Sequence, residues 1–299
     1  MAGLRPWIQA FRLRTLPLAV SSILVGSALA RFSGTARPVV LLAALLTAIL
    51  LQVLSNLAND VGDHLHGTDN ADRVGPARSV QSGAISVPTM KRAMLICGAL
   101  AFLSGLWLIF SALGVGSAAW VFVLIGVLAI GAAVKYTYGT TPYGYLGLGD
   151  ISVFLFFGIA GVMGTYYLHT RTLDLVLLLP AAAFGAMSAA VLNVNNMRDI
   201  RNDQASGKIT LAVRLGTDGA KSYHGLLIVG AMVCLMLFTA LNFRGMPQWG
   251  YLITTSVMAS HLRIVLRNHD PAALDPELKR VALGTFATAL AFSIGLWMV

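Results

Sequence analysis

Long apolar runs dominate this chain and alternate with short polar segments. They lie at residues 15–31, 38–58, 90–112, 117–134, 150–168, 173–195, 220–241, 248–266 and 279–298. Each run is close to the roughly 20 residues that an α-helix needs to cross the hydrocarbon core of a bilayer. The pattern therefore predicts an all-α, polytopic membrane protein with nine transmembrane helices.

The composition agrees with this prediction. The chain is 57% hydrophobic and 11% charged, with a mean hydropathy of +0.76, whereas a soluble protein carries about 25% charged residues. The spans consume nearly the whole chain, so we expect one intramembrane domain over residues 1–299. The basic N-terminus resembles a signal peptide, but its apolar run leads straight into further spans and is expected to be a helix. Cys97 and Cys234 lie inside apolar runs, and we expect inert thiols there.

The basic residues predict the orientation. Of the 21 Lys and Arg residues, 17 fall on the side of the N-terminus, and the other side holds only Arg31, Arg37, Arg171 and Arg244. Cytoplasmic loops are enriched in Lys and Arg. We therefore expect a multi-pass protein of the cell inner (cytoplasmic) membrane, with a cytoplasmic N-terminus and the C-terminus on the opposite side. All acids except Asp174 share the cytoplasmic side.

Two acid-rich clusters interrupt the apolar pattern, at residues 56–63 and 195–203. Both follow an apolar run and contain the unit Asn-x-x-x-Asp with a further acid behind it: Asn56/Asp60 with Asp63, and Asn195/Asp199 with Asp203. Residues at i, i+3 and i+4 lie on one face of a helix. Carboxylates at the edge of a membrane are costly and usually functional. Two facing sets would form a cage of hard oxygen ligands, which suits Mg²⁺ when a substrate supplies phosphate oxygens.

Basic and aromatic residues accompany the clusters. The loops that follow them carry Arg and Lys residues able to clamp phosphate oxygens, and a third loop at 135–150 adds Lys135 and Tyr138 as expected site residues. His64 and His66 are tempting metal ligands. Mg²⁺ prefers oxygen, however, so a loop role is favoured for them.

The amino-acid sequences of these motifs resemble those of a known family. Residues 55–60, 67–70 and 73–76, together with 192–199, 207–208 and 213–216, are similar to the UbiA superfamily of intramembrane aromatic prenyltransferases. They are most similar to its MenA branch, which prenylates 1,4-dihydroxy-2-naphthoate in menaquinone synthesis. The gap from Asp63 to Asp69 is wider than in the hydroxybenzoate-type relatives, which leaves the role of Asp69 open.

The resemblance implies transfer of a polyprenyl group from its diphosphate to the ring carbon that bears the carboxylate of 1,4-dihydroxy-2-naphthoate. CO₂ and diphosphate would leave, and the product would be demethylmenaquinone. Two Mg²⁺ ions and nearby cations would neutralise the departing diphosphate. Asn56, Asp60 and Asp63 are expected to hold one ion, and Asp199 and Asp203 the other.

The remaining roles follow from the same chemistry. Tyr138 is expected to face the allylic cation or to bond the phosphate, and with Asp60, Asp199 and Lys135 it makes up the expected catalytic set. Arg12 and Arg14 could attract the carboxylate of the acceptor, although simple anchoring at the membrane surface is favoured for them. The residues expected to grip the diphosphate are Arg78, Lys135, Arg198 and Lys208.

Two alternatives stay open at this point. A secondary transporter would also show repeated units and intramembrane carboxylates, but its ionisable groups tend to lie near the bilayer midplane. A prenyltransferase for another aromatic acceptor, such as 4-hydroxybenzoate, would share both acidic clusters. Prenyl chain length and the base that deprotonates the acceptor do not follow from the sequence.

Overall fold

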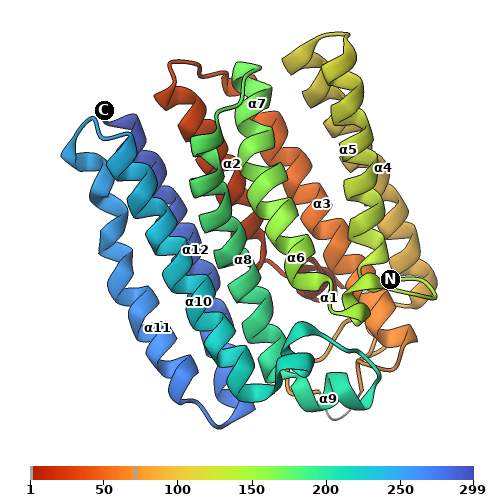
Figure 1. The fold of residues 1–299 in the computed structure, drawn as a ribbon. Coiled ribbons are helices and arrows are strands. Elements are labelled where there is room, and N and C mark those ends of the chain that lie inside the picture. The colour runs from red at the N-terminus through yellow and green to blue at the C-terminus, as the bar shows by residue number, and fades with distance from the viewer. Residues whose placement is uncertain (1–2, 71–72) are drawn as a thin grey trace.

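A computed structural model describes residues 3–70 and 73–299, and within these ranges the chain forms helices joined by loops (Figure 1). The helices in chain order are α1 (Leu4–Phe11), α2 (Leu16–Phe32), α3 (Pro38–Leu65), α4 (Val87–Leu113), α5 (Ser117–Lys135), η1 (Tyr143–Leu146), α6 (Gly149–Val153), η2 (Phe154–Gly164), α7 (Thr165–Thr170), η3 (Leu175–Leu177), α8 (Leu178–Arg198), α9 (Ile200–Ala205), α10 (Leu211–Leu241), η4 (Met246–Thr254), α11 (Thr255–Arg267), η5 (Pro271–Ala273) and α12 (Leu274–Trp297).

The all-α membrane fold is confirmed, but the count of nine spans is not. In the described part of the chain, seven helices are long and apolar enough to cross a membrane. An eighth span is reached if α1 and α2, which meet at a bend of 50°, count as one. The expected span at 248–266 is divided between η4 and α11. Because α11 has only 13 residues, it is about 20 Å long and shorter than the hydrocarbon core.

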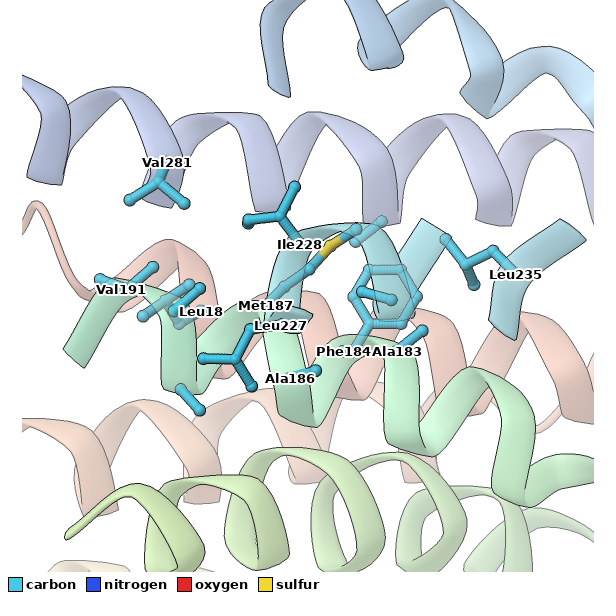
Figure 2. Close-up of a cluster of buried hydrophobic side chains, with 14 of the residues drawn as sticks. Leu18, Ala183, Phe184, Ala186, Met187, Val191, Leu227, Ile228, Leu235 and Val281 are labelled. Atoms are coloured by element: carbon cyan, nitrogen blue, oxygen red, sulfur yellow. The ribbon is translucent and has the colours of Figure 1, made fainter. Parts of the chain in front are cut away.

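Helix α8 forms the centre of the bundle. In the span that contains it, 67% of the apolar window is buried, against 6% for α5 at the periphery. Phe184 and Met187 of α8 pack between α10 and α12, as Figure 2 shows. On another side of α8, Gly185 lies against Gly158 of η2, where an added Cβ on Gly158 would meet a backbone oxygen at 2.4 Å. Small residues thus allow close helix packing, as is usual in membrane bundles.

The two ends of the bundle differ. The N-terminus, α9 and the loop between α3 and α4 lie at one end, and the C-terminus lies at the other (Figure 1). Both acidic clusters are at the end that holds the N-terminus, since α3 and α8 run toward it and finish there.

Candidate active site

A cavity of about 380 Å³ opens between α2, α3, α5, η2 and α8. Its interior is apolar and is lined by residues such as Leu108, Phe122, Ile125 and Phe156. Its other end is polar and contains groups from both acidic clusters together with several cations. The cavity therefore joins an apolar chamber to a charged mouth.

The first acidic cluster contributes a stripe from α3. Asn56, Asn59 and Asp63 line the cavity, and their spacing of three and four residues places them on one helix face. The Tyr145 hydroxyl donates a hydrogen bond of 2.9 Å to the Asp63 carboxylate. The Thr137 hydroxyl donates one of 2.8 Å to the Asn59 side-chain oxygen.

Close packing positions this stripe. A Cβ on Gly62 would lie 2.4 Å from the Thr137 carbonyl oxygen, so the glycine lets the segment after α5 rest directly on α3. That contact brings Thr137 to Asn59, a residue outside the set expected from the sequence. The signal was present, because Asn59/Asp63 is also an Asn-x-x-x-Asp unit and pairs with Asn195/Asp199 at the same spacing.

Asp60, expected as a metal ligand and catalytic residue, does not line the cavity. It is buried just beside the stripe, and its carboxylate accepts hydrogen bonds from the backbone N–H groups of Ser79 and Val80, at 3.3 and 3.2 Å. Asp60 thereby anchors the loop that covers the site. Asn56 does reach the cavity, but its amide nitrogen is engaged with the Phe11 carbonyl at 2.9 Å.

The second acidic cluster lies where α8 ends and α9 begins. Asp199 and Asp203 both line the cavity and are buried. Arg198 donates two hydrogen bonds to the Asp199 carboxylate, at 3.1 and 2.7 Å. Asp203 Oδ2 is buried and makes no hydrogen bond within the described residues. Burial raises the pKa of Asp203 to about 6, although the nearby Lys208 acts in the opposite direction.

Lys208 connects the two clusters. Its ammonium lies 3.7 Å from Asp63 Oδ1 and 3.6 Å from Asp203 Oδ1. Burial lowers the pKa of this lysine, but the carboxylates of Asp63 and Asp203 outweigh burial, so that the net pKa is raised. Lys208 is therefore a protonated cation, and it occupies a position where the surroundings favour positive charge.

Four arginines complete the polar end of the cavity. Arg12, Arg14, Arg73 and Arg78 all line it. Asp69, whose role the sequence left open, lies 3.1 Å from Arg73 Nε and 3.7 Å from Arg78 Nε. Asp69 thus holds two of the arginines in place. Burial is the main reason that the pKa of Asp69 is raised.

The structure does not bring Lys135, Tyr138 and Arg198 to the cavity. Lys135 is exposed at the end of α5, and Tyr138 packs outside with Lys91 5.4 Å from its ring centre. Tyr136 and Tyr143 line the cavity instead. Successive residues of a helix end point in different directions, so a sequence cannot tell Lys135 from Tyr136. Arg198 turns away toward Asp199 and Asp275.

The cavity mouth has the chemistry of a cation site without a complete ligand set. Within residues 3–70 and 73–299, no three His, Cys, Asp or Glu side chains come together in a metal-binding group. The oxygen donors instead face the cavity in two sets, Asn59 with Asp63 and Asp199 with Asp203. This arrangement suits Mg²⁺, which is usually bound by one or two carboxylates plus substrate phosphates and water. The unpaired Asp203 oxygen agrees with that assignment.

The sequence matches the UbiA prenyltransferase family over residues 19–290. It is 46% identical to the 1,4-dihydroxy-2-naphthoate octaprenyltransferase of Escherichia coli (strain K12), over 98% of this chain and 95% of that protein. It is 42% identical to the enzyme of the same name from Haemophilus influenzae, over 98% and 96%. The structure of a UbiA homolog from Archaeoglobus fulgidus bound to GPP and Mg²⁺ aligns with a TM-score of 0.62 at 13% identity, covering 97% of this chain and all of that one. The chain belongs to the UbiA prenyltransferase family.

Proposed function

We propose that this protein transfers a polyprenyl group from polyprenyl diphosphate to 1,4-dihydroxy-2-naphthoate, releasing CO₂ and diphosphate and forming demethylmenaquinol, the reduced form of demethylmenaquinone. The observation that supports this most strongly is the cavity itself, which joins an apolar chamber to a mouth with two carboxylate sets and several cations. Such a cavity suits a substrate with a long hydrocarbon chain and a charged head. The relatives that are 40–46% identical are named 1,4-dihydroxy-2-naphthoate octaprenyltransferase.

The two sets of oxygen donors at the cavity mouth are the proposed Mg²⁺ ligands. Asp63 with Asn59 would hold one ion, and Asp199 with Asp203 the other, which replaces Asp60 of the expected set with Asn59. Asn56 stays in the first set, because the hydrogen bond from its amide nitrogen to the Phe11 carbonyl does not occupy the side-chain oxygen that would bind the ion. Bound Mg²⁺ would supply charge neutralisation for the departing diphosphate.

The chain's own cations bind and orient the diphosphate. Lys208 lies between the two carboxylate sets, and Arg78 and Arg73 lie on the covering loop, held by Asp69. Charge that develops on the leaving oxygen would be stabilised by these preorganised groups. We therefore keep Arg78 and Lys208 as diphosphate-binding residues, add Arg73, and leave out Lys135 and Arg198.

The apolar chamber holds the prenyl chain and keeps water from the allylic cation. The ring carbon that bears the carboxylate forms the new C–C bond while the allylic C–O bond breaks. The carboxylate then leaves as CO₂, and its bonding electrons restore the aromatic ring. The acceptor carboxylate has to lie near the mouth for this step, and Arg12 and Arg14 in the turn between α1 and α2 are the proposed partners.

The proposed orientation places this mouth in the cytoplasm. The N-terminus lies at the same end as both acidic clusters, and the C-terminus at the opposite end (Figure 1). Together with the distribution of Lys and Arg, this supports insertion into the cell inner membrane with the site facing cytosolic Mg²⁺ and the acceptor.

Acceptor choice tests the proposal. Purified protein should be given polyprenyl diphosphate and Mg²⁺ with equal amounts of 1,4-dihydroxy-2-naphthoate and 4-hydroxybenzoate, and the products separated by mass. We expect demethylmenaquinol, which air oxidises to demethylmenaquinone, with little prenylated 4-hydroxybenzoate. A dominant hydroxybenzoate product would overturn the assigned acceptor, and absence of both products would overturn the assigned reaction.

A further inference from the structure

A second cavity, of about 520 Å³, lies behind the second acidic cluster. It is bounded by α9, by α10 and by the connection from α11 to α12. Asp199 lines both cavities, whereas Arg198 lines only the second. The Arg198–Asp199 pair is therefore a wall between the proposed active site and this separate space, for which the proposed reaction has no use.

The lining of the second cavity is cationic. Its charged and polar lining includes Arg198, Arg201, Lys221, Thr217, Asn268 and His269. Asp199 is the carboxylate among the described lining residues, and Arg198 pairs with it through two hydrogen bonds. Among the described lining residues no further acid faces Arg201 and Lys221, and the ion-pair partner of Lys221, Asp218, lies outside the lining.

Lys221 is the strongest sign of a ligand. Its side chain is 90% buried, yet within the described chain it makes no hydrogen bond. Its ion-pair partner is Asp218 at 3.7 Å, whose own side chain is 99% exposed to solvent. An ion pair with a partner so exposed contributes little, so Asp218 only weakly compensates the charge of Lys221. Such a cation beside an open cavity calls for an anionic partner there.

The backbone of α10 adds a second contribution. Gly216 has φ 68° and ψ 177°, so the helix breaks there, and a new helical segment starts at Thr217 and continues to Leu241. Thr217 and Lys221 both line the cavity, at the start of this segment and one turn later. The first N–H groups of a helix lack intrahelical partners and attract anions, phosphate above all.

We propose that the second cavity is a phosphate-binding site distinct from the active site, built from Lys221, Arg201 and the start of the second segment of α10. Its ligand is a phosphate-bearing anion, either free inorganic phosphate or diphosphate or the head group of an anionic phospholipid. Apolar residues such as Val265 and Leu274 line the same space. The site does not depend on the proposed prenyl transfer, so either conclusion can fail without the other.

Direct binding tests the site. Full-length protein with Lys208→Gln, which weakens diphosphate binding at the active site, should be placed in phosphatidylcholine nanodiscs with EDTA and titrated with radiolabelled inorganic diphosphate. Adding Lys221→Gln should weaken binding at least ten-fold, because it removes a charge-assisted contact. Lys221→Arg should retain binding. Lys279→Gln is the matched control, because it removes the same charge from an exposed position on α12 outside both cavities.

A second experiment distinguishes a free phosphate anion from a lipid head group as the ligand. The nanodiscs are remade with phosphatidylglycerol, and lipids retained by the protein are counted by native mass spectrometry. A free anion is indicated if diphosphate binding is unchanged by phosphatidylglycerol. A lipid head group is indicated if phosphatidylglycerol displaces diphosphate and its retention is lost in Lys221→Gln. The proposal is overturned if Lys221→Gln behaves like Lys279→Gln in both experiments.

Discussion

Arg198 grips the carboxylate of Asp199 with two hydrogen bonds, from Nε at 3.1 Å and from Nη2 at 2.7 Å. Its third nitrogen, Nη1, contacts Asp275 at the start of α12. The guanidinium is thus fully engaged on the protein side of the site. Arg198 is a positioning residue that fixes a proposed metal ligand, and it is not a free cation awaiting diphosphate.

Arg198→Ala should therefore act through Mg²⁺. We expect kcat to fall by about ten- to a hundred-fold, since a charged hydrogen bond contributes about 1.5–3 kcal/mol. The Mg²⁺ concentration that gives half-maximal activity should shift, while the KM for prenyl diphosphate at saturating Mg²⁺ should change little. Kinetics over a Mg²⁺ titration would show this. A loss confined to the donor KM would mean that Arg198 contacts the diphosphate after all.

Substitutions of Asp63 and Asp60 should have different effects, one on turnover and the other on stability. Asp63→Asn keeps the shape that Tyr145 requires but removes a charge at the cavity, so turnover should fall more than a hundred-fold. Asp60→Asn should keep most of its turnover and instead lower the free energy of unfolding by about 1.5–3 kcal/mol, because the covering loop loses a charged acceptor. Activity assays and thermal unfolding measure the two effects.

The control for this pair is Asp174→Asn. Asp174 is an exposed cap of η3 far from the clusters in sequence, and it accepts a hydrogen bond from the backbone of Val176. Asn caps helices as well as Asp does, so both readouts should stay near wild type. Equal losses of activity at Asp60 and Asp63 would show that Asp60 reaches the metal during turnover.

Metal binding should weaken in mildly acidic solution. Burial raises the pKa of Asp203 to about 6, so the carboxylate is ionised above pH 6 and takes up a proton as the pH falls through 6. Protons and Mg²⁺ then compete for it. The apparent Mg²⁺ affinity should fall about ten-fold per pH unit below 6. With an Asp of ordinary pKa, the same loss of Mg²⁺ affinity would begin only near pH 4. In metal-free protein the same raised pKa works in the opposite direction, so the free energy of unfolding should increase as Asp203 is protonated.

Mg²⁺ titrations at pH 7.5, 6.0 and 5.0 would measure the affinity, with Asp203→Asn as the comparison. The variant should bind Mg²⁺ more weakly at pH 7.5 and lose the steep dependence near pH 6. A flat wild-type affinity down to pH 5 would contradict the raised pKa.

A buried polar chain should stabilise the C-terminal helices. His224 of α10 contacts His261 of α11 at 2.9 Å, and His261 contacts Glu277 of α12 at 2.7 Å. Glu277→Ala removes the charged partner of the His261 hydrogen bond, and should lower the free energy of unfolding by about 1.5–3 kcal/mol. Arg280→Ala removes the partner of Glu277 that is 42% exposed, and should cost less than about 1 kcal/mol. Thermal unfolding in one detergent compares them, and equal effects would argue against a structural role for the histidines.

The sequence predicted the membrane fold and the shared end of both acidic clusters, because apolar runs and charged clusters are local features. Of the expected site residues, those that line the cavity are Arg12, Arg14, Asn56, Asp63, Arg78, Asp199, Asp203 and Lys208, and their roles stay predictions. The missed residues depend on tertiary contacts. Asn56/Asp60 and Asn59/Asp63 have the same spacing, and only the Ser79–Val80 backbone and the Gly62–Thr137 contact decide which Asp faces the cavity.

Similar reasoning explains the remaining differences. Lys135 and Tyr136 are adjacent in sequence, and the direction of each side chain is fixed only once α5 has packed. The pairing of Arg198 with Asp275 joins residues that are 77 positions apart. The interrupted helix at 246–267 looks like a span because its residues are apolar, and its short α-helical part is visible only in the structure.

The stoichiometry of a single turnover tests the central claim most directly. Purified protein in excess should be mixed with polyprenyl diphosphate, Mg²⁺ and 1,4-dihydroxy-2-naphthoate labelled in its carboxyl group, and CO₂, diphosphate and prenylated product counted together. We expect one labelled CO₂ and one diphosphate for each demethylmenaquinol, and none of the three when EDTA is present. A prenylated product that retains the labelled carboxyl group, or product formed in EDTA, would contradict it.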